Sequence, residues 1–329
     1  MAIELIERGK PFGSVASVLL KNGFNVNALR TNDTLLYDEW KLIDTAVMKA
    51  YQDRLVVAAD LQARGLTYDI GNGLAKTVLA YQDMSDVNDA EMSMDGIRRG
   101  DRDRPDYQMN YLPLPIIHKD FSFSARELAE SRNGSMPLDT TMAERCARKI
   151  AEKVEDIILT GASTYSFGGG AVYGFLDFPD AQSVSLSAHW NDSGATGATI
   201  LDDVLSMKQK MIDAKRYGPW MVYACTDFET KLDEDYVSGY PKTIRQRLLE
   251  IGGIIDVKIA DHLTADYVVM VQMTSDVIRL VNGLGITTVQ WDTEGGMQTN
   301  FKVMTIQVPQ IRTDQPGKTA NTSGVVYAT

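Results

Sequence analysis

The chain is poor in the residues from which metal and redox sites are built. It contains only three histidines and two cysteines in 329 residues. His118, His189 and His262 lie more than seventy residues apart and form no HxxxH pattern, and Cys146 and Cys225 form no CxxC pair. The sequence therefore predicts no metal site and two buried thiols in a reducing compartment.

Long apolar runs and excess positive charge are also missing. No apolar run approaches the roughly 18 residues of a membrane span, and the N-terminal MAIELIERGK lacks the apolar core of a signal peptide. We therefore expect no membrane partner and a chain that stays in the cytoplasm where it is made. Lys and Arg number 33 against 44 Asp and Glu, a net charge of -11. Sequence-specific nucleic-acid binding needs clustered positive charge. We therefore expect the protein to enclose any nucleic acid nearby rather than to bind it.

Catalytic and nucleotide-binding motifs are absent as well. There is no GxSxG, no Rossmann glycine pattern and no nucleophilic Cys/His signature. Three glycines at 168–170 lack the Lys-Ser or Lys-Thr of a phosphate loop, which favours a loop and strand crossing. His118, Lys119 and Asp120 are adjacent, but alternation along a strand sends neighbours to opposite faces, so we do not expect them to converge. The sequence predicts no enzyme and no cofactor; an α/β enzyme with a site near the three glycines is a minor alternative.

The strongest positive signal is one long helix between Pro137 and Gly161. Asp139, Thr140 and Thr141 offer side-chain oxygens to the amides of its first turn, and Thr141 with Glu144 predicts a capping box. Gly161 is a natural stop. Charged residues, among them Glu155, occupy the other faces, and at about 1.5 Å per residue the helix is roughly 30 Å long. One face is predicted to be buried, because apolar residues recur there at spacings of three and four: Ala143, Ala147, Ile150, Val154, Ile157 and Ile158. We expect a strut rather than a core helix.

A long hairpin is predicted before this helix. Two strand-like runs, Lys76 to Met84 and Tyr111 to Phe123, flank about two dozen polar residues. Structureless loops beyond roughly 12 to 15 residues are uncommon unless they have a task or are disordered, so this one is expected to disorder or to lie on another subunit. Its alternating charges indicate ion pairs between subunits, with a solvated loop as the alternative. The predicted interface residues are Arg98, Arg99, Asp101, Arg102, Asp103 and Arg104.

The other segments are weaker signals. A helical pattern starts at Tyr37 and extends weakly towards Gly65. Ser124 with Glu127 predicts the cap of a short helix. Helices and strands alternate after residue 199, as in a small α/β unit, and a closing β hairpin follows. The tail after Asp314 is polar and is expected to be loose.

The order of these pieces resembles that of the major capsid proteins of tailed bacteriophages and of the encapsulin shell proteins. The resemblance is carried by residues 112–161, LPLPIIHKDFSFSARELAESRNGSMPLDTTMAERCARKIAEKVEDIILTG, and by ITTVQWDTEGGMQTNFKVMTIQVPQI. It implies an α+β phage major capsid protein fold. The implied parts are an N-terminal arm (1–32), an N-terminal helix region (33–65), an extension loop (66–112), a peripheral domain (113–198) with a spine helix (140–160), an axial domain (199–285), and closing peripheral strands with a C-terminal tail (286–329).

The resemblance also implies a function. The chain would be the structural subunit of an icosahedral virus capsid, assembling with itself into pentamers and hexamers that enclose double-stranded DNA. Its other partners would be scaffolding, portal and decoration proteins, and its location the virion, assembled in the host cytoplasm. An encapsulin-like nanocompartment around cargo enzymes is the alternative within the same fold. The arm at 1–32 favours the virion protein, because encapsulin chains usually begin near the first helix.

Overall fold

The computed structural model describes residues 5–7, 10–12, 37–52, 55–84, 92, 94, 104, 107–133, 140–192, 194–237, 242–313 and 323–329. The chain divides into two compact units. Unit 1 comprises Met1–Thr77, Leu114–Ile158 and Leu280–Val308, and unit 2 comprises Val78–Pro113, Leu159–Arg279 and Pro309–Thr329. Within the described ranges, no helix has both the length and the apolar character needed to cross a membrane.

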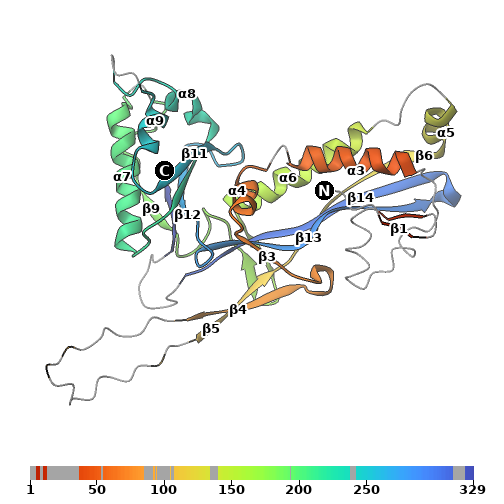
Figure 1. The fold of residues 1–329 in the computed structure, drawn as a ribbon, viewed down its shortest axis with the longest axis horizontal. Helices are drawn as coiled ribbons and strands as arrows, with labels where there is room; N and C mark the ends of the chain where they lie inside the picture. The colour runs from red at the N-terminus through yellow and green to blue at the C-terminus, as the bar shows by residue number, and fades with distance from the viewer. Residues whose placement is uncertain are drawn as a thin grey trace. The chain divides into compact units, whose positions relative to one another are not determined.

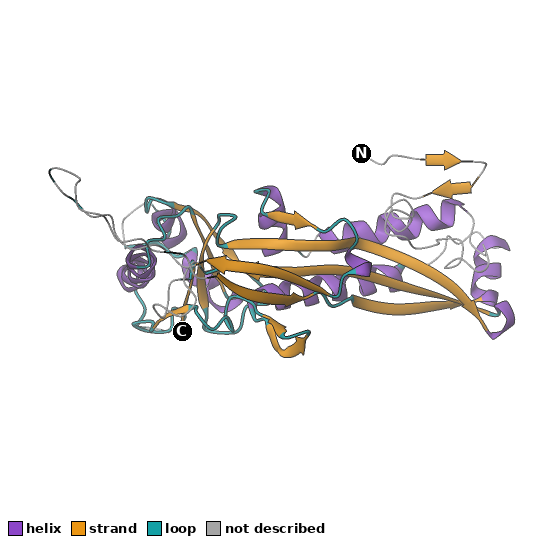
Figure 2. Ribbon diagram, turned by 90° about the horizontal axis from the view of Figure 1, so that it is seen from below, coloured by secondary structure: helices purple, strands orange, loops and turns teal. Residues whose placement is uncertain are grey.

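Unit 1 is a layer of helices on a sheet of long strands. The sheet has the order β3-β13-β14-β6, and Figure 1 shows α3 and α6 along one face of its long strands, which run side by side in Figure 2. The strands are β3 (Thr67–Asp69), β6 (Ile117–Ser124), β13 (Ile278–Thr293) and β14 (Gln298–Ile311). The helices are α3 (Tyr37–Gln52), α4 (Val57–Ala63), α5 (Ala125–Asn133) and α6 (Thr141–Leu159), and β1 (Leu5–Glu7) pairs with β2 (Lys10–Phe12).

Unit 2 is built on a mixed five-stranded sheet with the order β11-β10-β12-β15-β9. Every residue of β10 and β12 is buried, as expected of interior strands covered on both faces. Helix α7 contacts β9 and β15, and α9 contacts β11 (Figure 1). The strands are β9 (Gln182–Val184), β10 (Trp220–Ala224), β11 (Ile254–Ile259), β12 (Val268–Gln272) and β15 (Val325–Ala328); the helices are α7 (Gly197–Asp213), α8 (Glu229–Leu232) and α9 (Ile244–Leu249).

The long helix predicted from the sequence is α6, and its apolar stripe is buried. All six predicted stripe residues are at most 4% exposed, and Gly161, with φ of +87°, follows the helix end as predicted. The cap differs by one residue, because the Glu144 amide donates to the Thr140 carbonyl oxygen (3.0 Å) and Thr140 Oγ1 donates to Glu144 Oε1 (3.2 Å). The first helical residue is Thr141, so the predicted Thr141 cap is wrong and Thr140 takes that position.

Glu155 departs from its predicted place on the polar surface of this helix. Its side chain is buried, at 2% exposed. Its carboxylate accepts hydrogen bonds from the amides of Val56 (3.0 Å), Val57 (3.1 Å) and Ala58 (3.0 Å). These are among the amides at the start of α4 that no turn of the helix can satisfy, and Val56 supplies no side-chain cap. One residue of α6 therefore caps another helix almost a hundred positions earlier.

The predicted hairpin is confirmed, but its second strand was misplaced. β4 (Val78–Met84) pairs antiparallel with β5 (Tyr107–Pro113) over their full lengths. The predicted run from Tyr111 to Phe123 is instead divided, since β6 begins at Ile117 and pairs with β14. Pro113 and Pro115 explain the break, because proline has no amide to donate to a strand ladder.

The end of the chain was also mispredicted. Residues 314–322 lie outside the described ranges, but Val325–Ala328 form β15, which lies between β12 and β9. Val325, Val326 and Ala328 are fully buried. The tail is therefore not loose at its end, because the four residues Val-Val-Tyr-Ala fill an interior strand position that only the fold provides.

Several local signals are confirmed. The Ser124 amide donates to Glu127 Oε2 (2.7 Å) and the Glu127 amide donates to Ser124 Oγ (3.2 Å), which is the predicted capping box of α5. Cys146 and Cys225 are buried free thiols. Burial raises the pKa of both, so both stay protonated and unreactive at neutral pH.

Replacing Glu155 should show how much the carboxylate cap contributes to the free energy of unfolding. We expect Glu155→Ala to lower the free energy of unfolding by roughly 3 kcal/mol, since each buried amide left without an acceptor costs roughly 1 to 3 kcal/mol. Urea unfolding measures this. Glu152→Ala is the matched control on the same helix, because Glu152 forms ion pairs with Arg148 and Lys149 on the helix surface, and losing such pairs should cost about 0 to 1 kcal/mol. Equal losses in the two variants would contradict the assigned role.

Glu155 should also make stability depend on pH. Burial raises its pKa from 4.5 to about 7; the three amide hydrogen bonds oppose this rise and Asp60 adds to it. Between these values the folded chain holds a proton that the unfolded chain has lost, so the stabilisation is complete below pH 4.5 and is lost as the pH rises through about 7. Unfolding free energy should therefore fall over this range, and Glu155→Gln should flatten that part of the profile. Parallel profiles for the two chains would rule out Glu155 as the titrating group.

Candidate subunit-interaction surface

The base of the β4–β5 hairpin presents large apolar side chains to solvent. On β5, Tyr107, Met109 and Tyr111 are 63%, 47% and 42% exposed. Successive side chains of a strand point to opposite faces, so these three, spaced by two, share one face. Apolar side chains gathered in this way on a single chain mark an interaction site more often than isolated ones do.

A second, shorter hairpin supplies two more exposed rings. β7 (Ala162–Phe167) pairs with β8 (Gly170–Val172), and Tyr165 and Phe167 are about half exposed. The turn between the strands is Gly168 and Gly169, whose φ values of +62° and +86° are the left-handed pair that two-residue hairpins favour. The three glycines are therefore a turn and a strand start, in agreement with the predicted loop and strand crossing.

The third glycine lets the two hairpins touch through their backbones. A Cβ atom on Gly170 would lie 1.7 Å from the carbonyl oxygen of Tyr111, and one on Gly168 would lie 2.6 Å from Val78 Cγ2. No side chain fits at Gly170 without separating β8 from β5. The β7–β8 hairpin is thus held against β5 by a contact that requires glycine.

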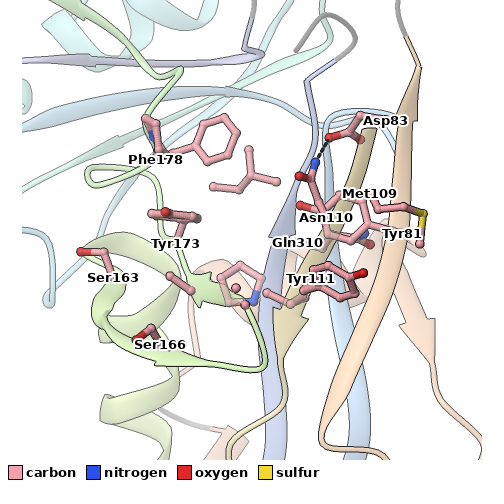
Figure 3. A pocket seen from close by; sticks show the side chains of 17 residues that line it. Tyr81, Asp83, Met109, Asn110, Tyr111, Ser163, Ser166, Tyr173, Phe178 and Gln310 are labelled. Carbon is pink, nitrogen blue, oxygen red and sulfur yellow. Dashed lines mark hydrogen bonds between the residues drawn. The ribbon is translucent and has the colours of Figure 1, made fainter. Parts of the chain in front are cut away.

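A pocket of about 510 Å³ opens between these hairpins and the end of β14, all within unit 2 (Figure 3). Its aromatic lining consists of Tyr81, Tyr111, Tyr173 and Phe178. Its polar lining consists of Asp83, Asn110, Ser163, Ser166 and Gln310. The pocket is therefore mixed in character, with four rings beside five polar side chains.

Asp83 is the charged group of this pocket. It is 4% exposed, and Figure 3 shows the hydrogen bond that Asn110 Nδ2 donates to its Oδ2. Arg312 Nε lies 3.9 Å from Asp83 Oδ1, so the buried negative charge is balanced within the unit. The pKa of Tyr81 is raised to about 12, chiefly by burial and also by the nearby Asp83, while Arg312 opposes the rise. Tyr81 therefore keeps its proton and remains a hydrogen-bond donor.

Gln310 is a second polar group with unused capacity. It is 1% exposed, and neither Nε2 nor Oε1 has a hydrogen-bond partner among the residues that the structure describes. A buried amide of this kind normally finds partners, because leaving a polar atom unpaired costs roughly 1 to 3 kcal/mol. Gln310 thus keeps a buried side-chain amide beside the pocket.

The interface residues predicted from sequence are mostly beyond the described ranges. Arg98, Arg99, Asp101, Arg102 and Asp103 lie outside them, and Arg104 is described and exposed. Their pairing with another subunit stays a prediction. Two other residues of the same connection, Met92 and Met94, are described and are 101% and 106% exposed.

No metal centre is assembled by the described residues, since no group of three His, Cys, Asp or Glu side chains lies close enough to bind an ion.

One histidine does meet a carboxylate, contrary to expectation: His118 Nδ1 is 3.5 Å from Asp120 Oδ1. The two residues lie two positions apart on β6 and so share a face. The prediction considered only directly adjacent residues, which point to opposite faces. Asp120 also lies 3.5 Å from Lys302 Nζ, which makes this an exposed cluster of charges on the sheet.

The pocket itself was missed from the sequence. The alternation YQMNY, residues 107–111, was a usable sign that β5 has a face of large apolar side chains. It could not show that this face is left open, because that depends on where β8 and β14 are placed. No residue of the pocket belongs to a recognisable motif.

Comparison with known proteins adds a family and a fold. Residues 27–328 match a family of unknown function, DUF6260. Among solved structures, the virus-like particle from Pyrococcus furiosus is similar at a TM-score of 0.62 and 17% identity, covering 89% of this chain and 99% of that chain. The capsid of Myoviridae Phage XM1 is similar at a TM-score of 0.60 and 10% identity, covering 81% of this chain and 90% of that chain. Microbacterium phage Oxtober96 is similar at a TM-score of 0.55 and 10% identity, covering 81% of this chain and 90% of that chain.

These similarities show that the chain has the phage major capsid protein fold, as the sequence resemblance implied. At such low identities the likeness is one of fold, and no residue of the pocket is assigned by it.

The glycine contact between the hairpins should be intolerant of any side chain. We expect Gly170→Ala to lower the midpoint of thermal unfolding by several degrees, because its methyl group would clash with the Tyr111 carbonyl oxygen. Differential scanning calorimetry measures this. Gly194→Ala is the matched control in unit 2, since a Cβ atom there meets nothing within 4 Å. An unchanged midpoint for Gly170→Ala would show that β8 does not pack on β5 as described.

Proposed function

The chain belongs to DUF6260, a family of unknown function, and from its capsid-type fold we propose that it is the structural subunit of an icosahedral virus capsid. Copies of the chain would form pentamers and hexamers that enclose double-stranded DNA. The observation that carries the proposal is the extent of the fold match, which reaches 99% of the virus-like particle chain and 90% of the phage XM1 capsid chain. Similarity over whole chains supports a role for the whole fold rather than for one shared motif.

The physical properties of the chain support this role. Closed shells reuse the same subunit surfaces around each symmetry axis, so a subunit needs contact surfaces more than it needs a catalytic centre. The exposed apolar residues of β5 and β7 are candidates for such contacts. A net charge of -11 suits a shell that repels packaged DNA and binds none of it specifically. Scaffolding, portal and decoration proteins are the further partners we propose, and the virion, assembled in the host cytoplasm, is the proposed location.

The parts of the fold receive proposed roles on the same basis. The β4–β5 hairpin with its connection is the extension loop, within residues 66–112. Helix α6 is the spine of a peripheral domain comprising residues 113–198 and the closing strands from 286. The five-stranded sheet with α7 and α9 contains the axial domain, residues 199–285.

A nanocompartment enclosing cargo enzymes, like an encapsulin shell, is the second candidate. The fold match to the virus-like particle from Pyrococcus furiosus favours it, because both the TM-score of 0.62 and the identity of 17% exceed those of the two phage structures compared above. The contents of native particles separate the two candidates.

Electron microscopy of the purified protein tests the shell. We expect closed icosahedral particles, and particles from a producing culture should contain nuclease-protected double-stranded DNA. Particles that hold an enzyme and no nucleic acid would favour the nanocompartment. A chain that stays monomeric under all assembly conditions, with no particle in culture, would refute both.

The arginines of the hairpin connection should contribute to assembly through their charge. Replacing Arg98, Arg99, Arg102 and Arg104 together with Ser should leave the subunit folded and reduce particle yield, since small terms of about 0 to 1 kcal/mol per exposed ion pair are repeated around a shell. Circular dichroism and sedimentation measure the two effects. Lys at the same four positions is the matched control and should retain assembly. Normal particle yield and melting of the Ser variant would remove these residues from the interface.

A further inference from the structure

We propose that the groove between β12 and β9 is a receptor for an extended peptide, and that its occupant, Ser323–Thr329, is a separable strand that the same segment of a second molecule can replace. The interaction belongs to the class of β-strand addition, in which a peptide completes a sheet. The inference goes beyond the proposed function and does not depend on it, because it concerns the single subunit.

The receptor arises from the order of the five-stranded sheet of unit 2. Strands β10, β11 and β12 pair with one another within residues 220–272. In the part of the chain that the structure describes, β15 is the only strand neighbour of β9, and Val326 of β15 pairs with Gln182, 144 positions earlier. Pairings between distant positions form late, because closing a long loop costs entropy first. We therefore infer that three strands form first and that β9 joins them only when β15 is inserted.

Main-chain hydrogen bonds hold the segment on both of its edges. It pairs with β12 at four positions and with β9 at three. At its start, the Gln272 amide donates to the Gly324 carbonyl oxygen (2.9 Å). At its end, the Thr329 amide donates to the Val184 carbonyl oxygen (3.2 Å), and the Leu186 amide donates to the Thr329 carbonyl oxygen (3.0 Å). Such bonds give a bound strand its affinity without any covalent tie.

The side chains of the segment fit the groove closely. Val325, Val326 and Ala328 are 0% exposed, so their burial stabilises the inserted strand. A Cβ atom on Gly324 would lie only 2.4 Å from Val277 Cγ1, which leaves no room for a side chain. The receptor therefore selects a peptide in which glycine is followed by small or β-branched apolar residues.

The first residue of the segment fixes its register. Ser323 is fully buried, and its carbonyl oxygen accepts a hydrogen bond from Gln182 Nε2 (3.1 Å). Its Oγ accepts a second one from the Val325 amide (3.0 Å). A shift by one residue would break these bonds and would turn every side chain to the opposite face. The segment thus has one position in the groove.

The segment is separable because its contacts are with distant parts of the chain. Its partners are β9, β12 and α7, and residues 314–322 join it to the strand before it. Such a tie raises the effective concentration of the segment and adds no contact within the groove. Since every copy has the same groove and the same segment, one copy's segment fits another copy, which is the basis of domain swapping.

Cutting the tie in the folded full chain tests the proposal on unassembled subunits. A specific protease sequence is inserted between residues 313 and 323, and the chain is cut after folding. Native mass spectrometry should show that the segment stays bound, and an excess of fluorescent peptide 323–329 should then replace it. Unfolding of the chain on cutting would overturn the proposal, as would the absence of exchange at every temperature below the unfolding midpoint.

Two competitor peptides show whether exchange takes place in the groove. The peptide with Gly324→Leu should compete at least about tenfold more weakly, because overpacking a close-fitting site is destabilising on this scale. The peptide with Thr329→Ala is the matched control and should compete as well as the natural one, since Thr329 is exposed. Equal competition by the Gly324→Leu peptide would contradict binding in the groove. Because no shell is needed for these measurements, either result leaves the proposed capsid role to its own test.

Discussion

One buried carboxylate joins the helical layer of unit 1 to the segment that enters its sheet. Glu155 of α6 accepts hydrogen bonds from three consecutive amides at the start of α4, and α4 leads directly into β3, which pairs in parallel with the long strand β13. The Leu280 amide donates to the Leu66 carbonyl oxygen at this junction. The cap therefore fixes the start of α4 against α6, and the other end of α4 leads into the sheet. Removing the carboxylate would leave three buried donors without an acceptor, so few other side chains can take its place.

Direct backbone contact through glycine is the second constraint, and it recurs in both units. In unit 1 a Cβ atom on Gly73 would lie 2.2 Å from the carbonyl oxygen of Gly283, and in unit 2 Gly170 meets Tyr111 in the same manner. In unit 2 the pocket lies beside this contact, and the exposed rings of β5 and β7 belong to the hairpins that it joins. These hairpins carry the exposed apolar residues that we propose as contacts between subunits.

The distribution of polar groups fits a structural role. Buried carboxylates in this chain are bound by amides and hydroxyls: Asp203 accepts from the Ser187 amide (3.0 Å) and from Trp190 Nε1 (3.0 Å). They hold loops and helix ends in place. Exposed apolar side chains gather on the β4–β5 hairpin, and the unpaired Gln310 amide of β14 lies beside it. A shell subunit needs its binding capacity at such edges, since its partners are copies of itself.

The sequence by itself determined the features that depend on neighbours a few positions apart. The buried stripe of α6, the Ser124–Glu127 cap and the stop at Gly161 follow from helical periodicity and local hydrogen bonding, and the order of these pieces was enough for the fold class. Only the tertiary structure decided the role of Glu155, the separation of β5 from β6, the burial of β15 and the existence of the pocket. Glu155 looks like any surface glutamate in its own helix, because its partners are 97 to 99 positions away. The partner of β6 is β14, almost two hundred residues later. Such pairings are set by which surfaces remain unpaired when the chain is folded, and no short stretch of sequence carries that information.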